Sequence, residues 1–191
     1  KFHNEEELEN LLSFINIEKQ KLKIKTPIAV KISPDIDDKN IEKICQILIK
    51  FKIDAVIVSN TTDKNRRNLK NINKLEKGGL SGKPLEGISN NIINKFYKIL
   101  QNRIKIIGVG GVDSGYSAFE KILNGANLVQ LYTGMVYQGP DIAYKIAKEL
   151  IDILKEKRIE NISSIIGKKK WTWLISFMSL YNNFLCQKNV N

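Results

Sequence analysis

Cysteine and histidine are scarce in this sequence. Its 191 residues include two cysteines, Cys45 and Cys186, and one histidine, His3. Two cysteines so far apart form no disulfide framework, and a single histidine does not complete a zinc-ligand cluster. Ser-His-Asp and Cys-His catalysis are left with almost no candidate, since His3 is most simply a solvated residue near a chain end. We therefore predict neither a metal site nor histidine-dependent catalysis.

Acidic residues are outnumbered, with 20 Asp+Glu against 31 Lys+Arg and a formal net charge of +11. Nucleic-acid binding is one interpretation of such an excess. The excess is mostly lysine, spread along helix faces without interleaved aromatic residues, so we predict no nucleic-acid partner. With 42% hydrophobic and 27% charged residues, the composition indicates one globular domain with a substantial core.

Short apolar runs alternate with helically spaced apolar residues along most of the chain. After a helix at about 5–14, strands are expected at 27–32, 53–58, 104–109 and 126–131, each followed by a helix, at about 38–51, 85–100, 114–124 and 140–157. This alternation predicts a parallel sheet, either doubly wound or closed into a (β/α)8 barrel. A barrel needs about 250 residues, so four units make half of one.

Glycine-rich turns follow the last two expected strands, as Gly110-Gly111 and Tyr132-Thr133-Gly134. Such turns bring bare backbone N–H groups together, which suits a phosphate, although glycines also serve as plain turn residues. In barrels, a phosphate site between the loops after strands seven and eight is recurrent. On that interpretation the fold class is α/β, a (β/α)8 TIM barrel, and this chain supplies about its last four β/α units.

Polar side chains stand at the ends of the first two strands. Lys31 lies within an apolar strand, where an ammonium group is unfavourable unless it faces a cavity or an anion. Alternation places it on the same side as Ala29, toward the barrel interior, where it can stabilise negative charge on a cofactor ring. The other interpretation is a lysine that snorkels from an exposed strand end. Asn60 and Thr61 offer amide and hydroxyl groups to a planar polar substrate, or form a plain turn.

Five segments carry a family resemblance over about residues 1–168. They are VKISPD (30–35), IVSNTT (57–62), GGLSGKPL (78–85), IIGVGGVDSG (106–115) and LVQLYTGMVYQGP (128–140). In order and spacing they resemble the class 2, quinone-linked dihydroorotate dehydrogenase family, and GGLSGKPL together with LVQLYTG is highly specific for it.

The resemblance implies an FMN-containing barrel that oxidises (S)-dihydroorotate to orotate in de novo pyrimidine biosynthesis, with ubiquinone as electron acceptor. It also implies a peripheral position at a bacterial or mitochondrial inner membrane. Lys31 would touch the pyrimidine edge of the flavin, and Tyr132 and Thr133 would hold the phosphate. In all, the resemblance implies FMN contacts from Lys31, Ser59, Gly82, Gly111, Tyr132 and Thr133, and contacts to dihydroorotate or orotate from Asn60 and Thr61.

The family's earlier strands, its N-terminal membrane-binding helices and its general-base serine have no counterpart in the sequence, which starts at Lys1 and is expected to be part of a longer chain. That serine lies in an N-x-S-x-P-N context, which surrounds neither Ser33 nor Ser81, so we predict no catalytic residue here. We expect the N-terminal half of the barrel as a partner. Half a barrel leaves its end strands unpaired, so the isolated chain is expected to be a poor enzyme and prone to aggregate.

Residues 169–191 form an apolar tail with no family counterpart, following a half-barrel domain at 1–168. Trp171–Cys186 carries no charge but is shorter than the roughly 20 residues of a membrane-spanning helix. It is either an interfacial anchor, with Lys168-Lys169-Lys170 on lipid phosphates, or an irregular extension that packs on the body or frays.

Two other functions stay open. A different FMN-dependent barrel oxidoreductase would share the phosphate loops but not Lys31 together with Asn60 and Thr61. A non-catalytic half-barrel remnant would keep the fold and lose the activity.

Overall fold

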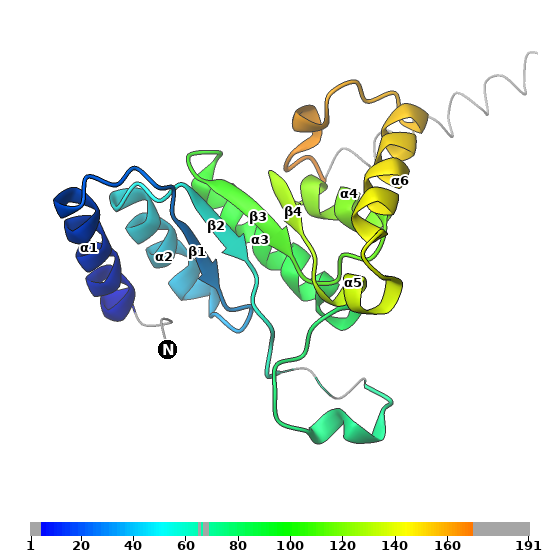
Figure 1. The fold of residues 1–191 in the computed structure, drawn as a ribbon, viewed down its shortest axis with the longest axis horizontal. Coiled ribbons are helices and arrows are strands. Elements are labelled where there is room, and N and C mark those ends of the chain that lie inside the picture. The colour runs from blue at the N-terminus through cyan, green and yellow to red at the C-terminus, as the bar shows by residue number, and fades with distance from the viewer. Residues whose placement is uncertain (1–4, 65, 67–68, 170–191) are drawn as a thin grey trace, which may run out of the picture.

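Four parallel strands form the centre of the computed structural model, which describes residues 5–64, 66 and 69–169. Their order in the sheet is the order in the chain, so each crossover moves one strand along in the same direction, as the alternating pattern predicts. Within the described residues, the first and last strands form the two edges of the sheet. The strands are β1 (Ala29–Ile32), β2 (Ala55–Val58), β3 (Lys105–Val109) and β4 (Leu128–Gln130) (Figure 1).

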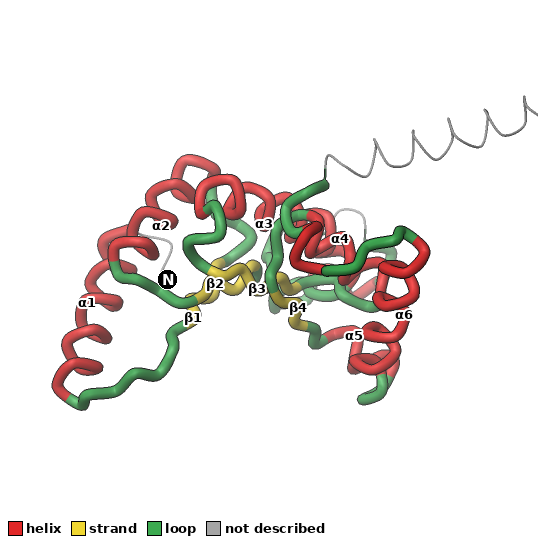
Figure 2. The backbone as a smooth tube through the Cα atoms, turned by 90° about the horizontal axis from the view of Figure 1, so that it is seen from above, coloured by secondary structure: helices red, strands yellow, loops and turns green. Residues whose placement is uncertain are grey.

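The helices lie along the outer side of the arc that the strands form (Figure 2). A helix in the connection from each strand to the next lets all strands run in the same direction. A short helix, α5 (Thr133–Gln138), follows β4 directly. The longer helix after it, α6 (Ile142–Glu156), packs on α4 (Gly115–Leu123), the helix between β3 and β4. The helices are α1 (Glu5–Lys21), α2 (Asp38–Lys50), α3 (Glu86–Leu100), α4 (Gly115–Leu123), α5 (Thr133–Gln138) and α6 (Ile142–Glu156).

The main core lies between the sheet and the helices. Val56 and Val58 of β2 and Ile106 of β3 are buried and belong to one cluster with Leu48 of α2 and Phe96 of α3. The buried residues of the strands are two positions apart, because successive side chains of a strand point to opposite faces. One face of the sheet therefore packs against the helices.

The opposite, concave face of the sheet carries a row of register partners across all four strands. Lys31 is the partner of Ile57, Ile57 of Ile107, and Ile107 of Leu128. Lys31 and Ala29 are both exposed, which confirms that they share a face away from the main core. In a closed barrel this face is the interior.

Some elements differ from the sequence-based expectation. Helix α1 continues to Lys21 instead of ending near residue 14, because good helix formers follow and Lys21 pairs with Glu18 at 2.7 Å. Helix α5 and the 3₁₀ turns Ile72–Leu75, Lys83–Leu85 and Ile162–Ile165 are too short to show periodicity.

None of the helices in the described part of the chain combines the length and the apolar composition of a membrane-spanning segment. The two interpretations of the tail concern residues that, from 170 onward, lie outside the described residues.

Phe96 and Phe14 offer a matched test of where the core lies. Phe96 is completely buried in α3, whereas Phe14 of α1 is 63% exposed. Phe96→Ala should lower the free energy of unfolding by about 3–5 kcal/mol because it leaves a cavity. Phe14→Ala should change it by less than about 0.5 kcal/mol. Urea unfolding followed by circular dichroism measures both, and equal effects would contradict this core.

Candidate functional site

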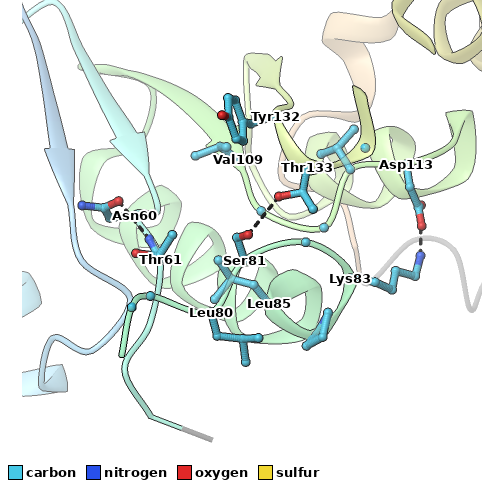
Figure 3. A pocket seen from close by; sticks show the side chains of 18 of the residues that line it. Asn60, Thr61, Leu80, Ser81, Lys83, Leu85, Val109, Asp113, Tyr132 and Thr133 are labelled. Atoms are coloured by element: carbon cyan, nitrogen blue, oxygen red, sulfur yellow. Dashed lines mark hydrogen bonds and ion pairs between the residues drawn. The ribbon is translucent and has the colours of Figure 1, made fainter. Parts of the chain in front are cut away.

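The carboxyl ends of the four strands open into one cavity of about 760 Å³ (Figure 3). Its size lies in the range of small-molecule sites, about 300–1,000 Å³. Parallel strands end at the same edge of a sheet, so loops far apart in the chain meet there. All eight residues singled out from the sequence line this cavity: Lys31, Ser59, Asn60, Thr61, Gly82, Gly111, Tyr132 and Thr133.

The end of β2 is held to both neighbouring strands. The Asn60 N–H donates to the Ile32 carbonyl at 2.8 Å, and the Ser59 N–H donates to the Val109 carbonyl at 3.2 Å. Asn60 Oδ1 accepts the Thr61 N–H at 2.9 Å (Figure 3). Ser59 is buried, whereas Asn60 and Thr61 are exposed at the cavity. The strand end therefore presents one amide group and one hydroxyl group to a ligand.

Lys31 brings a positive charge to the same cavity from β1. Its side chain is exposed and stands on the concave face, where its register partner is the apolar Ile57. Within the described part of the chain, no carboxylate forms an ion pair with it. The charge is therefore available to an anionic or electron-rich ligand group.

The glycine-rich segment 78–82 forms part of the cavity wall and packs against Thr61. Thr62 and Leu80 exchange two backbone hydrogen bonds, at 3.1 and 2.7 Å, which close the long loop after β2 at its base. A Cβ at Gly79 would lie 2.0 Å from Thr61 Oγ1, so only glycine allows Thr61 to lie there. This contact fixes Thr61 against the loop.

The same segment also packs on the turn after β4. Thr133 Oγ1 donates to Ser81 Oγ at 2.9 Å (Figure 3). Gly82 has φ +74°, and a Cβ there would lie 2.9 Å from Thr133 Cγ2. Tyr132 differs from its neighbour, because its side chain is 73% exposed while Thr133 points to Ser81 (Figure 3). Gly82 and Thr133, both predicted to hold a phosphate-bearing cofactor, are thus direct neighbours.

The turn after β3 completes a wall that is poor in side chains. Gly111 has φ +75°, and a Cβ there would lie 2.5 Å from Glu86 Cβ and 2.9 Å from Glu86 N. The turn therefore packs tightly on the first residue of α3. The backbone of the turn, which carries no side chains at the two glycines, lines the cavity. Together with Gly82 and Thr133, it offers backbone N–H and hydroxyl groups, which are the kinds of group that phosphate sites use.

At the rim of the cavity, Lys83 forms ion pairs with two carboxylates. Its Nζ lies 2.8 Å from Glu86 Oε2 and 3.1 Å from Asp113 Oδ1. The hydrogen bond to Glu86, with a further one to Asp113, raises the pKa of Lys83 above its ordinary value. Lys83 therefore stays protonated at neutral pH and joins segment 78–85 to the turn after β3.

The sequence analysis missed the residues that support the loop after β2. Thr62 is buried and donates its Oγ1–H to Asp35 Oδ1, while the Asp63 N–H donates to Asp35 Oδ2 at 3.1 Å. Asp35 and Thr62 stand in two of the quoted segments, but nothing in their spacing indicates that they bind each other. Arg66 contacts the carbonyls of Glu76 and Gly78, and no sequence pattern marks it.

Comparison with known proteins links this geometry to one family. The family model for dihydroorotate dehydrogenase matches residues 1–154. A dihydroorotate dehydrogenase (quinone) of Vibrio cholerae is 47% identical over 151 residues, which are 76% of this chain and 44% of the relative. The mitochondrial dihydroorotate dehydrogenase (quinone) of Mus musculus is 41% identical over 163 residues, 84% of this chain and 41% of that protein. The chain thus spans less than half the length of these curated relatives.

Solved structures show the same similarity in three dimensions. A crystal structure of DHODH from Eimeria tenella in complex with ferulenol superposes with a TM-score of 0.82 at 30% identity. The match covers 88% of this chain and 49% of the Eimeria chain. The four-stranded parallel sheet thus corresponds to about half of a TIM barrel, as the repeated β/α pattern predicts.

Gly111 and Gly87 test the tight packing of the turn after β3 on α3. Gly111→Ala places a Cβ against Glu86 at a positive φ, so it should lower the free energy of unfolding by about 1–3 kcal/mol. Gly87→Ala, in α3, meets no atom within 4 Å and should be neutral or stabilise by about 0.4–1 kcal/mol. Thermal unfolding of both variants is the measurement; indistinguishable melting temperatures would show that the turn does not pack as described.

Proposed function

The chain belongs to the dihydroorotate dehydrogenase family, and on that basis we propose that it forms the FMN- and substrate-binding half of a quinone-linked dihydroorotate dehydrogenase. The reaction proposed for the whole protein is the oxidation of (S)-dihydroorotate to orotate in de novo pyrimidine biosynthesis, with ubiquinone as electron acceptor. The chain spans 44% of its Vibrio cholerae relative, and the remaining part of the barrel is the proposed partner.

The observation that carries the proposal is the meeting of three kinds of group on one cavity. A wall poor in side chains, with Gly82, Gly111 and Thr133, suits a phosphate. Lys31 suits a ring edge that takes on negative charge, and Asn60 beside Thr61 suits a planar polar substrate. FMN carries both a phosphate and such a ring, so these donors fit it.

When bound, FMN would accept the hydride from the substrate and pass the electrons on to the quinone. Lys31 would hold a fixed positive charge at the ring edge, placed before the reaction starts and therefore needing no reorganisation. Asn60 and Thr61 would orient the substrate through directional hydrogen bonds, helped by the contact that fixes Thr61 against Gly79. None of the described residues is assigned to proton abstraction; we propose that the base lies in the other part of the barrel.

We also propose a peripheral position at an inner membrane. The relatives from Mus musculus and Schizosaccharomyces pombe are named as mitochondrial and quinone-linked. Ubiquinone is apolar and dissolves in the membrane, so an enzyme that reduces it must approach the lipid surface.

The proposed function is tested on the native protein, captured from its source with an antibody against α6. We expect stoichiometric FMN, bleaching of its visible absorbance by dihydroorotate, and recovery of the absorbance on addition of quinone. Flavin that other substrates bleach but dihydroorotate does not would indicate a different barrel oxidoreductase. A protein without flavin and without turnover would indicate a non-catalytic remnant and would overturn the proposal.

Lys31 and Lys105 provide a matched pair for the role of the positive charge. Both are exposed and stand on the same face of the sheet, but Lys105 lies at the amino end of β3, away from the cavity. Lys31→Met should slow flavin reduction about 100-fold, because a pre-placed charge is lost. Lys105→Met should leave the rate within about twofold. Stopped-flow reduction by dihydroorotate measures both, and a Lys31→Met rate close to wild type would refute the role.

A further inference from the structure

Lys121 is a buried lysine that the proposed chemistry does not use. It is fully buried in α4, and its Nζ donates to Ser89 Oγ at 3.1 Å and to Asn90 Oδ1 at 2.9 Å, both on α3. Its aliphatic stem lies under β3, since a Cβ at Gly108 would come within 3.2 Å of Lys121 Cδ. The ammonium group therefore sits behind the sheet, between two helices.

The charge of Lys121 has no close counter-charge in the described part of the chain. Both hydrogen-bond acceptors are neutral, and no carboxylate forms an ion pair with Nζ. The charged groups that act on it are Glu86 at the start of α3 and Lys83 just before it; around its stem, Gly108 of β3, Ile93 of α3 and Ala126 are uncharged. Burial lowers the pKa of Lys121 to about 8, which Glu86 opposes and Lys83 reinforces. An isolated buried ammonium group is unfavourable unless an anion compensates it.

A short chain of hydrogen bonds joins Lys121 to the glycine turn. Ser89, which accepts from Lys121, donates its Oγ–H to the Val109 carbonyl at 2.5 Å. The Val109 carbonyl also accepts the Ser59 N–H, and the next two residues are Gly110 and Gly111. Gly111 in turn packs on Glu86, the same residue whose charge acts on Lys121. The buried ammonium group thus lies directly behind the wall proposed to bind the phosphate.

We propose that Lys121 is a positioning residue that serves as the buried counter-charge of the FMN phosphate, supporting the Gly110–Gly111 turn from behind through Ser89 and the Val109 carbonyl. This inference rests on the proposed FMN site. On this proposal Lys121, which lies outside the cavity, contributes to the affinity for the phosphate of FMN. It does not contribute to the affinity for the flavin ring.

The proposal has a definite pH signature. A bound dianion favours the protonated form of Lys121, so it raises the pKa of that group, and binding above pH 8 must take up a proton. By linkage, the FMN affinity falls as pH rises above about 8, by up to tenfold per pH unit until the pKa of the complex is reached. The second ionisation of the phosphate itself, near pH 6, lies outside this window. Riboflavin shares the ring but lacks the phosphate, so its affinity should not show this slope.

The test compares FMN and riboflavin dissociation constants of the native protein, stripped of flavin, between pH 7 and 9.5, by quenching of flavin fluorescence. Because the ring is common to both ligands, the ratio of the two constants isolates the phosphate. We expect the wild-type preference for FMN over riboflavin to fall at least tenfold across this range. In Lys121→Met the preference should be about tenfold weaker at pH 7.5 and independent of pH.

Lys83→Met is the control, because Lys83 is an exposed lysine near the same turn whose raised pKa keeps it charged throughout this range. It should keep the slope, which begins at a somewhat higher pH because Lys83 no longer lowers the pKa of Lys121. If Lys121→Met does not fold, calorimetry of the wild type in buffers of different ionisation enthalpy measures the proton uptake directly at pH 8.5.

The outcomes separate the two proposals. A wild-type preference that does not change with pH, a slope that persists in Lys121→Met, or binding at pH 8.5 without proton uptake would each overturn the role of Lys121 while leaving the FMN site intact. A protein that binds neither FMN nor riboflavin would instead contradict the proposed function.

Discussion

The parallel register between β2 and β3 is the constraint on which the site depends. Val58 is the partner of Gly108, so Ser59 and Val109 come next to each other where the strands end, and the Ser59 N–H donates to the Val109 carbonyl. Because side chains alternate between the faces, a slip of one strand by one residue would move the helix-facing side chains of that strand to the concave face. The alternation stops at Val58, where β2 ends: Ser59 is buried, whereas Asn60 and the glycine turn both line the cavity.

Close approach of glycine backbone to neighbouring residues holds the loops of the site, together with side-chain hydrogen bonds. Gly79 lies against Thr61, Gly82 against Thr133, and Gly111 against Glu86, each at a distance that a Cβ would violate. Such contacts lock one loop to the next without filling the cavity with side chains. They explain why a segment between two strands shapes both the side of the cavity proposed for the substrate and the side proposed for the phosphate.

Three lysines lie in or near the cavity, and they differ in their exposure to solvent and in their partners. Lys31 is exposed on the concave face and stays available to a ligand, whereas Lys121 is buried behind the sheet with neutral partners. Lys83 at the rim is already neutralised by Glu86 and Asp113. Three lysines near one site therefore differ in their electrostatic surroundings, which follow from burial and from the distance to the nearest carboxylate.

The sequence by itself determined the order of strands and helices, because continuous apolar strands and helical spacing are local patterns. It also determined the candidate residues of the cavity, because polar and glycine-rich stretches follow each strand and parallel strands end at one edge. Only the tertiary structure decided that Asp35 supports Thr62 and that Lys121 is buried. In the sequence, Lys121 cannot be told from a solvent-exposed lysine of an amphipathic helix. Its burial depends on how α3 packs against α4. Contacts between distant segments are set by packing distances, and no local pattern of residues records them.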